Sequence, residues 1–587
     1  MYSKTIMAMF VVAVVCGASV LAEQTDVRVE LGSKSVQQYG RLEIEVTGVG
    51  EYERPGDPAE VRLDAEMVSP SGKKVAAPGF AMHKTREVKK GGDIKWEPYG
   101  DWLWRIRYMP DEIGTYKGVA VVTTKEGRRS SEEFSFEVSK SESKGIIRLA
   151  KQNPWAFEYS DGTPYIAIGQ NLGWAGGNRL EKYRKWISSM AANDCNFIRV
   201  WFGSTWCFGI QGKKAYIYNE DAAELLERVL GLCEERGIAI KLCLGDNIPS
   251  YLAGQNGPFK QCETKLDFLT KESAKTQWKG IQRYCVARYG ASTSIFAWEM
   301  WNEMVSNFGH GDEVAAWTEE MCRHVKSVDP HGHLAGNSTG MLGLNVYRQP
   351  SVDFTQYHRY GGANHKCYET PQTDDEPLFE VYAGRLRALR ELGKPVFLAE
   401  CGLTGAGWRA HPATDPGRAR EHPKDTKGYA FHESLWMGFI DGGAGAGQTW
   451  WWHGAVDYWN YYPQFKPFVK FVSDIPLNEA PLPPSSGEAE PENLRCFVRQ
   501  NGWGAIAWVV NANDGWYSLV IEGEKPAKVN GGKITFGGLE NGEYRVQLMY
   551  PWTGESTERT TSVENGQTTV SLPEFEIDIA VKLVKTG

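Results

Sequence analysis

Between residues 146 and 480, short apolar segments alternate with amphipathic segments of helical spacing, and this alternation constrains the fold more than any other feature of the sequence. The apolar segments are residues 164–169, 196–201, 238–244, 295–301, 333–337, 352–358, 395–399 and 447–452. Helices are expected at residues 180–192, 221–236, 273–289, 313–325, 378–392 and 430–440, where apolar residues recur every three or four positions. Eight strands with interleaved helices over roughly 320 residues predict a (β/α)8 TIM barrel. An open doubly wound sheet is the alternative, but no glycine-rich phosphate turn follows the first strand.

The segments on either side of this region have a different pattern. From residue 26 to 140, apolar and polar residues alternate in short runs such as 41–46, 102–108 and 116–122, and a polar stretch at 140–145 follows. After a proline- and serine-rich stretch at 481–487, alternation returns at residues 494–498, 504–510, 517–521, 543–549 and 577–583. Period-two alternation between turn residues predicts antiparallel strands. We therefore expect a multidomain chain with an N-terminal β-sandwich at 26–140, a central barrel at 146–480 and a C-terminal β-sandwich at 488–587.

The first 22 residues have the layout of a secretory signal peptide. Lys4 precedes an apolar run at residues 6–15, and small residues lead to Ala22. The alternative, a membrane anchor, needs about 20 apolar residues, and this run is shorter. Val15 before Cys16 does not fit a lipoprotein attachment site. The sequence predicts cleavage after Ala22 and a protein that is secreted, or periplasmic or extracellular.

Charge and composition narrow the classes of partner. The net charge of -8 argues against nucleic acid and anionic membranes. The chain contains 22 Trp, 26 Tyr and 23 Phe, whose rings suit stacking on sugars, although barrel and sandwich cores also use many aromatic residues. No CxxC pair or tight Cys/His cluster is present, so we predict no metal site and no cofactor. Cysteine spacing does not predict disulfide pairing, and nothing in the sequence predicts the oligomeric state.

Two glutamates follow predicted strands on opposite sides of the barrel. Glu303 follows the fourth strand, and Glu400 follows the seventh. Because the carboxyl ends of barrel strands meet in one cleft, these side chains should face each other across a bound sugar. Two carboxyls about 5–5.5 Å apart cleave a glycoside with retention, and a gap of about 6.5–9.5 Å gives inversion. The charge of Glu400 should also raise the pKa of Glu303. Taken singly, each glutamate also fits a solvated loop residue or a salt-bridge partner.

The run Trp301-Asn302-Glu303 and the segment 394–402 around Glu400 resemble the acid/base and nucleophile motifs of glycoside hydrolase clan A. The run 157–164 also resembles the entry to these barrels. The resemblance is to cellulase-like family 5 enzymes, including bacterial secreted proteins with a β-sandwich before the barrel. It implies a retaining mechanism with Glu303 as acid/base, Glu400 as nucleophile and Asn302 binding the sugar 2-hydroxyl. Cys401 departs from the pattern, because many relatives carry Phe or Tyr there.

Other residues gain expected roles from the same resemblance. Arg199 is a charge in an apolar strand, which is costly to bury unpaired, and the resemblance implies that it orients Glu400. A structural salt bridge is the alternative. His358 and Tyr360 follow strand six and resemble the clan's histidine and tyrosine near the two carboxylates, with Tyr357 competing for the second role. Either Trp450 or Trp452 is expected as the platform under the sugar.

Several further residues at strand ends are expected to contact the substrate, with structural roles as the alternative. They are Gln170, Asn171, Trp174, Trp201, Asp246 and Asn247.

The resemblance implies cleavage of a β-linked poly- or oligosaccharide, such as a β-glucan, β-mannan or β-galactan. Endo or exo action stays open, and so does sugar binding by the flanking sandwiches. A catalytically inactive carbohydrate-binding or scaffolding protein on the same fold is the alternative. A Ser/His hydrolase is disfavoured because the sequence has no Gly-x-Ser-x-Gly elbow.

Overall fold

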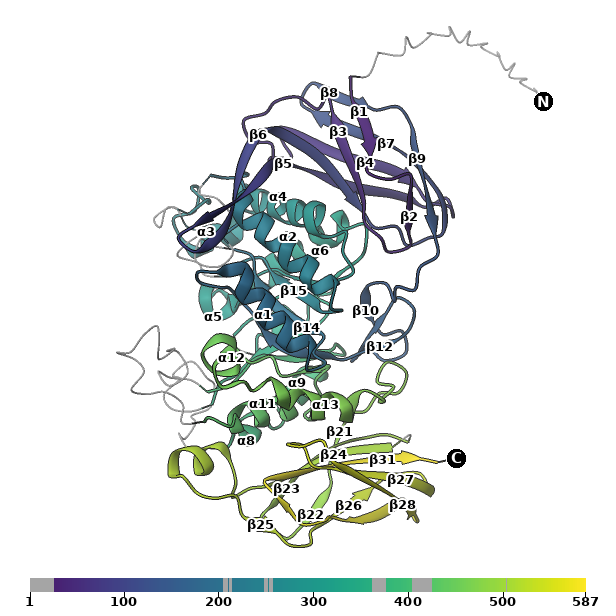
Figure 1. Cartoon of the computed structure of the whole chain (residues 1–587), viewed down its shortest axis with the longest axis vertical. Coiled ribbons are helices and arrows are strands. Elements are labelled where there is room, and N and C mark those ends of the chain that lie inside the picture. Colours follow the sequence, from purple (N-terminus) through teal and green to yellow (C-terminus); the bar gives the residue numbers. More distant parts are fainter. Residues whose placement is uncertain are drawn as a thin grey trace, which may run out of the picture.

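The structure is a computed structural model that describes residues 26–203, 209–210, 214–246, 252, 257–340, 342–361, 376–403, 425–502 and 504–586. A β-rich N-terminal domain, a central α/β domain and a β-rich C-terminal domain follow one another along the long axis of the molecule (Figure 1). The predicted multidomain fold class is confirmed. The predicted signal peptide at residues 1–22 lies outside the described residues. Among the described residues, no helix combines the length and apolar character needed to cross a bilayer.

The N-terminal domain is a strongly bent antiparallel sheet that folds over its own core. Its strands are β1 (Arg28–Leu31), β2 (Ser35–Gln37), β3 (Leu42–Thr47), β4 (Val61–Val68), β5 (Lys74–Lys90), β6 (Asp93–Tyr108), β7 (Gly114–Thr124), β8 (Gly127–Ser130) and β9 (Phe134–Ser139). The order is β1-β3-β6-β5-β4-β7-β9-β2, with β8 paired to β7 and a parallel β2–β9 contact at the end. Alternate residues of β4 are buried, which places side chains such as Leu63 in the core. Each such buried aliphatic side chain stabilises the fold by about 1.5–3 kcal/mol.

Among the described residues of the central domain there are eight barrel strands that pair in parallel, as the sequence predicts. They are β13 (Ala167–Asn171), β14 (Phe197–Trp201), β15 (Ala239–Cys243), β16 (Ile295–Glu299), β17 (Leu334–Gly336), β18 (Thr355–His358), β19 (Val396–Glu400) and β20 (Gly445–Ala446). Six form one sheet in the order β17-β16-β15-β14-β13-β20, and β18 pairs with β19. Hydrogen bonds on both sides of this pair close the barrel, including Asp353 N to Ala335 O at 2.9 Å and Ala444 N to Val396 O at 2.9 Å.

Helices alternate with these strands around the barrel. They include α1 (Arg179–Ala191), α2 (Glu220–Glu234), α3 (Lys265–Thr270), α4 (Glu272–Tyr289), α5 (Met304–Phe308), α6 (Gly311–Val328), α7 (Leu344–Tyr347), α8 (Leu378–Tyr382), α9 (Arg385–Arg390), α11 (Tyr429–Ile440), α12 (Asp457–Trp459) and α13 (Phe465–Val472). A small antiparallel sheet, β10 (Ile147–Leu149), β11 (Phe157–Tyr159) and β12 (Pro164–Tyr165), precedes the first barrel strand. Phe157 from this sheet stacks on Phe397 at 5.4 Å and meets Phe296 edge-on at 5.1 Å. These rings fill the bottom of the barrel, so functional groups gather at the opposite end.

Three predicted elements of the barrel differ from the structure. The strand expected at 164–169 begins at Ala167, because residues 164–165 form an antiparallel pair with β11 instead. The strand expected at 447–452 is β20 at Gly445–Ala446, and a π-helical turn, Trp452–Val456, begins where the expected strand ends. The helix expected at 378–392 is split into α8 and α9 by Gly384, whose φ is 74° and whose N–H donates to Asp441.

The C-terminal domain is a second β-rich body. Its larger sheet has the order β21 (Pro484–Ser485), β23 (Leu494–Gln500), β24 (Gly504–Asn511), β31 (Asp578–Lys585), β27 (Gly542–Met549) and β28 (Ser556–Val563). Smaller sheets contain β22 (Glu488–Glu490), β26 (Lys533–Gly537) and β29 (Gln567–Ser571), and β25 (Lys528–Val529) with β30 (Phe575–Glu576). The strand expected at 517–521 is instead a π-helical turn at Ser518–Glu522. This stretch leaves the sheet because the preceding Trp516 donates its backbone N–H to Glu433 of α11 at 2.6 Å.

Candidate active site

Glu303 lies just beyond the carboxyl end of β16, at the residue that precedes α5. Its backbone has φ 48° and ψ 46°, a left-handed conformation that is uncommon for a residue with a side chain. Such a conformation costs about 1–3 kcal/mol unless the surroundings enforce it. Here the Glu303 N–H donates to Ser338 Oγ at 2.9 Å. The side chain is 31% exposed, so one face of the carboxyl group is open to solvent.

Glu400 is the last residue of β19, and its side chain is only 4% exposed. Both of its carboxylate oxygens are engaged: Arg199 Nη1 donates to Oε1 at 2.6 Å, and the Tyr360 hydroxyl donates to Oε2 at 2.6 Å. Charge-assisted hydrogen bonds of this length hold a carboxylate in one orientation. Tyr360, one of the two tyrosines expected for this role, therefore contacts Glu400.

His358 links the two glutamates. Its Nδ1 lies 3.0 Å from Glu303 Oε1 and 3.5 Å from Glu400 Oε2. One oxygen of each glutamate and the histidine nitrogen all lie within 4.8 Å of one another. A distance of at most 4.8 Å between the nearest carboxylate oxygens fits the shorter of the two carboxyl separations found in glycosidases, about 5–5.5 Å, which is that of retaining enzymes.

Arg199 is fully buried on β14 and organises the floor of the site. Its guanidinium forms a bidentate pair with Glu299, with Nε at 2.6 Å and Nη2 at 2.8 Å from the two oxygens, besides its bond to Glu400. Arg199 thus combines the two roles that the sequence left as alternatives. It contacts Glu400, and it forms a structural ion pair with Glu299. Burial alone would raise the pKa of Glu299, but the charges of Arg199 and Lys241 lower it to about 2. Glu299 stays ionised and balances the buried arginine.

Two asparagines complete the partners of Arg199. Asn302 Oδ1 accepts from Arg199 Nη2 at 2.9 Å, which fixes the orientation of its carboxamide beside Glu303. Asn171 Oδ1 accepts from Arg199 Nη1 at 3.2 Å. The Asn171 amide also donates to the backbone oxygens of Ala399 and Gln448 at 3.1 and 2.9 Å, and its side chain is fully buried. Asn171 therefore ties barrel strands together below the carboxylates, rather than lying open to a substrate as expected.

Three tryptophans at or just after the carboxyl ends of barrel strands cluster beside the site. Trp201 packs on Trp450 with ring centroids 4.7 Å apart, and Trp174 lies 5.4 Å from Trp201 and 5.6 Å from Trp450. Trp450 and Trp174 are half-buried, whereas Trp452 is 1% exposed and packs in the core. Of the two residues expected as the sugar platform, only Trp450 presents surface, because Trp452 belongs to the π-helical turn. Trp201 is buried and supports Trp450 from behind.

Lys241 and Glu299 are functional candidates that sequence reasoning did not single out. Lys241 is fully buried in the barrel, where Nζ donates to Gln356 Oε1 and lies 3.4 Å from Gln448 Oε1. Burial lowers the pKa of Lys241 to about 7. The negative charge of Glu299 acts in the opposite direction but is the smaller effect. The sequence did contain a feature that could have identified both residues, because each is a charged residue inside a predicted apolar strand.

The remaining predicted residues lie as follows. Gln170 and Asp246 are buried in the central domain, and Asn247 lies outside the described residues. Cys401, which differs from the clan motif, is buried, and its backbone forms an isolated β-bridge with Thr449.

Glu303, His358 and Glu400 are also residue types that ligate metal ions. In this arrangement Glu400 already accepts from Arg199 and Tyr360, and Glu303 already lies against His358 Nδ1. Donors directed at both carboxylates favour a neutral polyhydroxylated ligand over a cation. The site can chemically supply one carboxyl group near solvent as an acid and one oriented carboxylate as a nucleophile.

Comparison with known proteins agrees with this chemistry. Residues 159–425 match the family Cellulase (glycosyl hydrolase family 5), and residues 35–119 match a domain of unknown function, DUF5060. Mannan endo-1,4-beta-mannosidase 7 of Arabidopsis thaliana is 24% identical over 330 residues, which cover 50% of this chain and 74% of that protein. Mannan endo-1,4-beta-mannosidase F of Aspergillus fumigatus is 28% identical over 138 residues, which cover 23% of this chain and 31% of that protein.

Solved structures extend the likeness in fold to nearly the whole chain. A Bacteroides vulgatus protein of known crystal structure superposes with a TM-score of 0.62 at 15% identity, covering 94% of this chain and 100% of that one. A second structure, titled glycoside hydrolase, has a TM-score of 0.50 at 13% identity and covers 76% of this chain and 97% of that one. The central domain of this chain therefore matches the family 5 glycoside hydrolases over residues 159–425, and the N-terminal domain matches DUF5060 over residues 35–119.

Proposed function

We propose that this protein hydrolyses a β-linked polysaccharide of the β-mannan type with retention of configuration. Glu400 acts as the nucleophile and Glu303 as the acid/base. The observation that carries the proposal is the position of one oxygen from each glutamate and His358 Nδ1 within 4.8 Å of one another. This spacing fits the shorter carboxyl separation, about 5–5.5 Å, at which one carboxylate attacks the sugar directly.

The surroundings of the two glutamates support this division of roles. In the first step Glu400 attacks the anomeric carbon, the glycosidic C–O bond breaks, and the proton of the Glu303 carboxyl group passes to the leaving oxygen. In the second step Glu303 takes a proton from water, which attacks the same carbon and releases Glu400. A buried carboxylate oriented by Arg199 and Tyr360 suits the first role. A part-exposed carboxyl group with access to water suits the second.

The type of substrate is supported by the relatives and by the tryptophan cluster. Two relatives are named as mannan endo-1,4-beta-mannosidases. Half-buried Trp450 and Trp174 offer flat apolar faces beside the carboxylates, and such faces stack on sugar rings. A β-glucan or β-galactan has no comparable support, and the mannan assignment is a proposal about this chain.

A non-catalytic sugar-binding protein is the competing function. Binding alone needs neither two carboxylates held side by side, which repel each other, nor the left-handed backbone at Glu303, which is costly. These two features favour catalysis over simple binding.

The experiment is product analysis on galactomannan, linear β-glucan and β-galactan, combined with proton NMR of the first product formed. We expect oligosaccharides from galactomannan that carry the β-anomer before mutarotation. An α-anomer as the first product would contradict retention. Hydrolysis of only the glucan or the galactan would overturn the mannan assignment while leaving the mechanism intact.

We also propose that the protein is exported and that residues 1–22 are removed on export. The charged start at Lys4, the apolar run at 6–15 and the small residues before Ala22 support this proposal. Intact mass measurement of protein from the culture medium or periplasm should show a chain that begins at Glu23. Retention of residues 1–22 in that fraction would contradict cleavage.

A further inference from the structure

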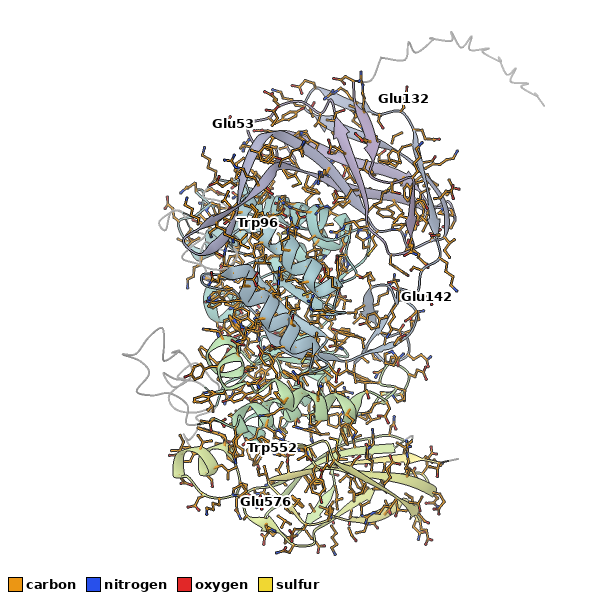
Figure 2. All side chains as sticks on the ribbon, in the orientation of Figure 1. Glu53, Trp96, Glu132, Glu142, Trp552 and Glu576 are labelled. Carbon is orange, nitrogen blue, oxygen red and sulfur yellow. The ribbon has the colours of Figure 1, made fainter. Side chains whose placement is uncertain are left out.

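A groove of about 560 Å³ lies on the N-terminal domain, apart from the barrel residues described above. It is lined by the stretches 45–52 and 100–104 together with His83, all from the first domain. The first stretch is the end of β3 and the loop after it, and the second belongs to β6. Figure 2 labels Glu53, which directly follows the first stretch.

An irregularity in the β5–β6 hairpin forms one wall of the groove. His83 pairs with Trp102 but the next residue, Lys84, pairs with Tyr99, so Gly100 and Asp101 bulge out of the ladder. Bulges of this kind re-aim side chains and are common beside functional sites. Gly100 has φ 74°, and its backbone oxygen lies 3.0 Å from His83 Nδ1. The bulge thus fixes the His83 ring and turns Asp101 outward.

Aromatic rings line the apolar part of the groove. His83 and Trp102 pack with ring centroids 3.8 Å apart and planes inclined by 35°, and both are half-buried. Tyr52, also half-buried, meets Trp104 edge-on at 6.2 Å. Half-buried rings held in place by neighbouring rings present rigid surfaces, and aromatic surfaces suit the apolar faces of pyranose rings.

Carboxylates supply the polar part of the groove. Glu51 and Asp101 are exposed, and neither side chain forms a hydrogen bond or ion pair with any of the described residues. Glu45 lies 3.7 Å from Arg105, whose side chain is not part of the lining. Exposed carboxylates accept hydrogen bonds from sugar hydroxyls. Since the lining contains no Lys or Arg, it would repel an acidic polysaccharide and suit a neutral one.

The groove faces the same side of the molecule as the mouth of the barrel. The His83 N–H donates to Glu220, the first residue of α2, at 3.3 Å. Barrel helices begin at the carboxyl ends of the strands, which is the end that carries Glu303 and Glu400. The tip of the same hairpin reaches α1, where Asp93 pairs with Arg179 at 2.9 Å. Figures 1 and 2 place Glu53 and α5, which begins after Glu303, on the same side.

We propose that this groove is a second binding site for a neutral β-linked glycan, distinct from the cleft in the barrel. It holds a distant part of the polymer whose chain enters the barrel cleft, and it gives the N-terminal domain a role in capturing polysaccharide. The identity of the polymer rests on the proposed function, but the presence of the site does not.

The test is native affinity electrophoresis through gels that contain galactomannan, hydroxyethylcellulose or β-galactan. All proteins carry Glu400→Ala, so that the gel is not cut. In at least one gel, Trp102→Ala should raise the apparent dissociation constant about fivefold or more, as expected for the loss of one stacked ring. Because Trp102 packs against the domain core, the double variant Glu51→Ala/Asp101→Ala is measured as well; it should weaken retardation without lowering the unfolding temperature.

The matched control is Ile113→Ala, which removes an exposed apolar side chain of the same domain outside the groove and should leave retardation unchanged. With Glu400 restored, Trp102→Ala should lower hydrolysis of the polymer while hydrolysis of short soluble oligosaccharides stays unchanged. Retardation that is absent in all three gels, or equal in the groove variants and the control, overturns the second site. Groove-dependent retardation without any hydrolysis contradicts only the catalytic proposal.

Discussion

At the scale of single residues, the site contains two glutamates in contrasting surroundings. Glu400 is buried and receives a hydrogen bond on each oxygen, whereas Glu303 is 31% exposed and has His358 as its neighbour. The left-handed backbone at Glu303 turns the chain from β16 into α5, and it aims the side chain back over the barrel mouth. This difference in environment supports the proposed roles of Glu303 as acid and Glu400 as nucleophile.

Replacing Glu303 with alanine tests the acid role. Hydrolysis of glycosides with poor leaving groups should fall by about 10²–10⁴, because the departing oxygen loses its proton donor. Aryl β-mannosides with very acidic leaving groups need little protonation, so their bond cleavage should slow much less. Steady-state rates on a series of aryl mannosides measure this difference. Equal losses across the series would count against Glu303 as the acid.

The principal site residues could be predicted because each follows a barrel strand and belongs to a recognisable run. Glu303, Glu400, Arg199, His358 and Tyr360 are brought together as expected. The sequence could not predict which of Trp450 and Trp452 is exposed, because Trp452 is buried by a π-helical turn that no local sequence pattern predicts. Nor could the sequence show that the Asn171 side-chain amide donates to backbone oxygens, since these acceptors lie more than 200 residues away in the chain.

At the scale of elements, β15 contains a fully buried lysine, Lys241. Lys241 points into the closed interior of the barrel, with Gln356 and Gln448 as hydrogen-bond acceptors and the rings of Phe197 and Phe397 within 5.7 Å. Burial lowers the pKa of Lys241 to about 7, whereas the unfolded chain keeps a pKa of about 10.4. Between these values the unfolded chain binds a proton that the folded chain does not.

Lys241→Met therefore tests the effect of pH on stability. In the wild type this lysine makes the free energy of unfolding rise with pH between about 7 and 10, because the unfolded state binds more protons there. The penalty for burying the charged form is complete below pH 7. The stability of the methionine variant relative to wild type should thus be greatest at pH 6 and should decline toward pH 10. Denaturant unfolding at several pH values measures this difference, and a difference independent of pH would contradict it.

Most barrel elements follow from periodicity, but their ends depend on distant contacts. Gly384 interrupts the helix expected at 378–392 because its N–H donates to Asp441, the residue that follows α11. The segment 517–521 alternates like a strand, yet the backbone of Trp516 is held by Glu433 of the barrel. In both places a buried carboxylate accepts backbone N–H groups, and this tertiary contact overrides the local pattern.

At the scale of the whole molecule, buried ion pairs and hydrogen bonds join the barrel to both flanking domains. Arg107 of β6 pairs with Glu227 of α2 at 3.0 Å and donates to the backbone oxygen of Arg288 at 2.6 Å. On the other side, Asp578 of β31 accepts from Trp508 at 2.7 Å and lies 2.7 Å from His432 Nε2 of α11. Because these groups are buried, the domains are expected to be rigidly joined.

Asp578→Ala tests the second of these junctions. It leaves two buried donors without an acceptor, and each should cost about 1–3 kcal/mol. We expect the C-terminal domain to unfold at a lower temperature in calorimetry. Glu574→Ala, which removes the partner of exposed Lys528 within the C-terminal domain, is the control and should leave the unfolding temperature nearly unchanged. Equal unfolding temperatures for the Asp578 variant and wild type would show that this contact does not join the domains.

The central claim is that Glu400 is the nucleophile of a retaining glycosidase, and chemical rescue tests it most directly. Glu400→Gly should lose hydrolysis by several orders of magnitude, since no covalent intermediate can form. With an activated aryl β-mannoside, added azide should enter the space left by the carboxylate and yield an α-glycosyl azide. The paired variant Glu303→Ala, which keeps the nucleophile, should instead give a β-glycosyl azide. Wild-type rates in Glu400→Gly, or a β-glycosyl azide from it, would contradict the assignment.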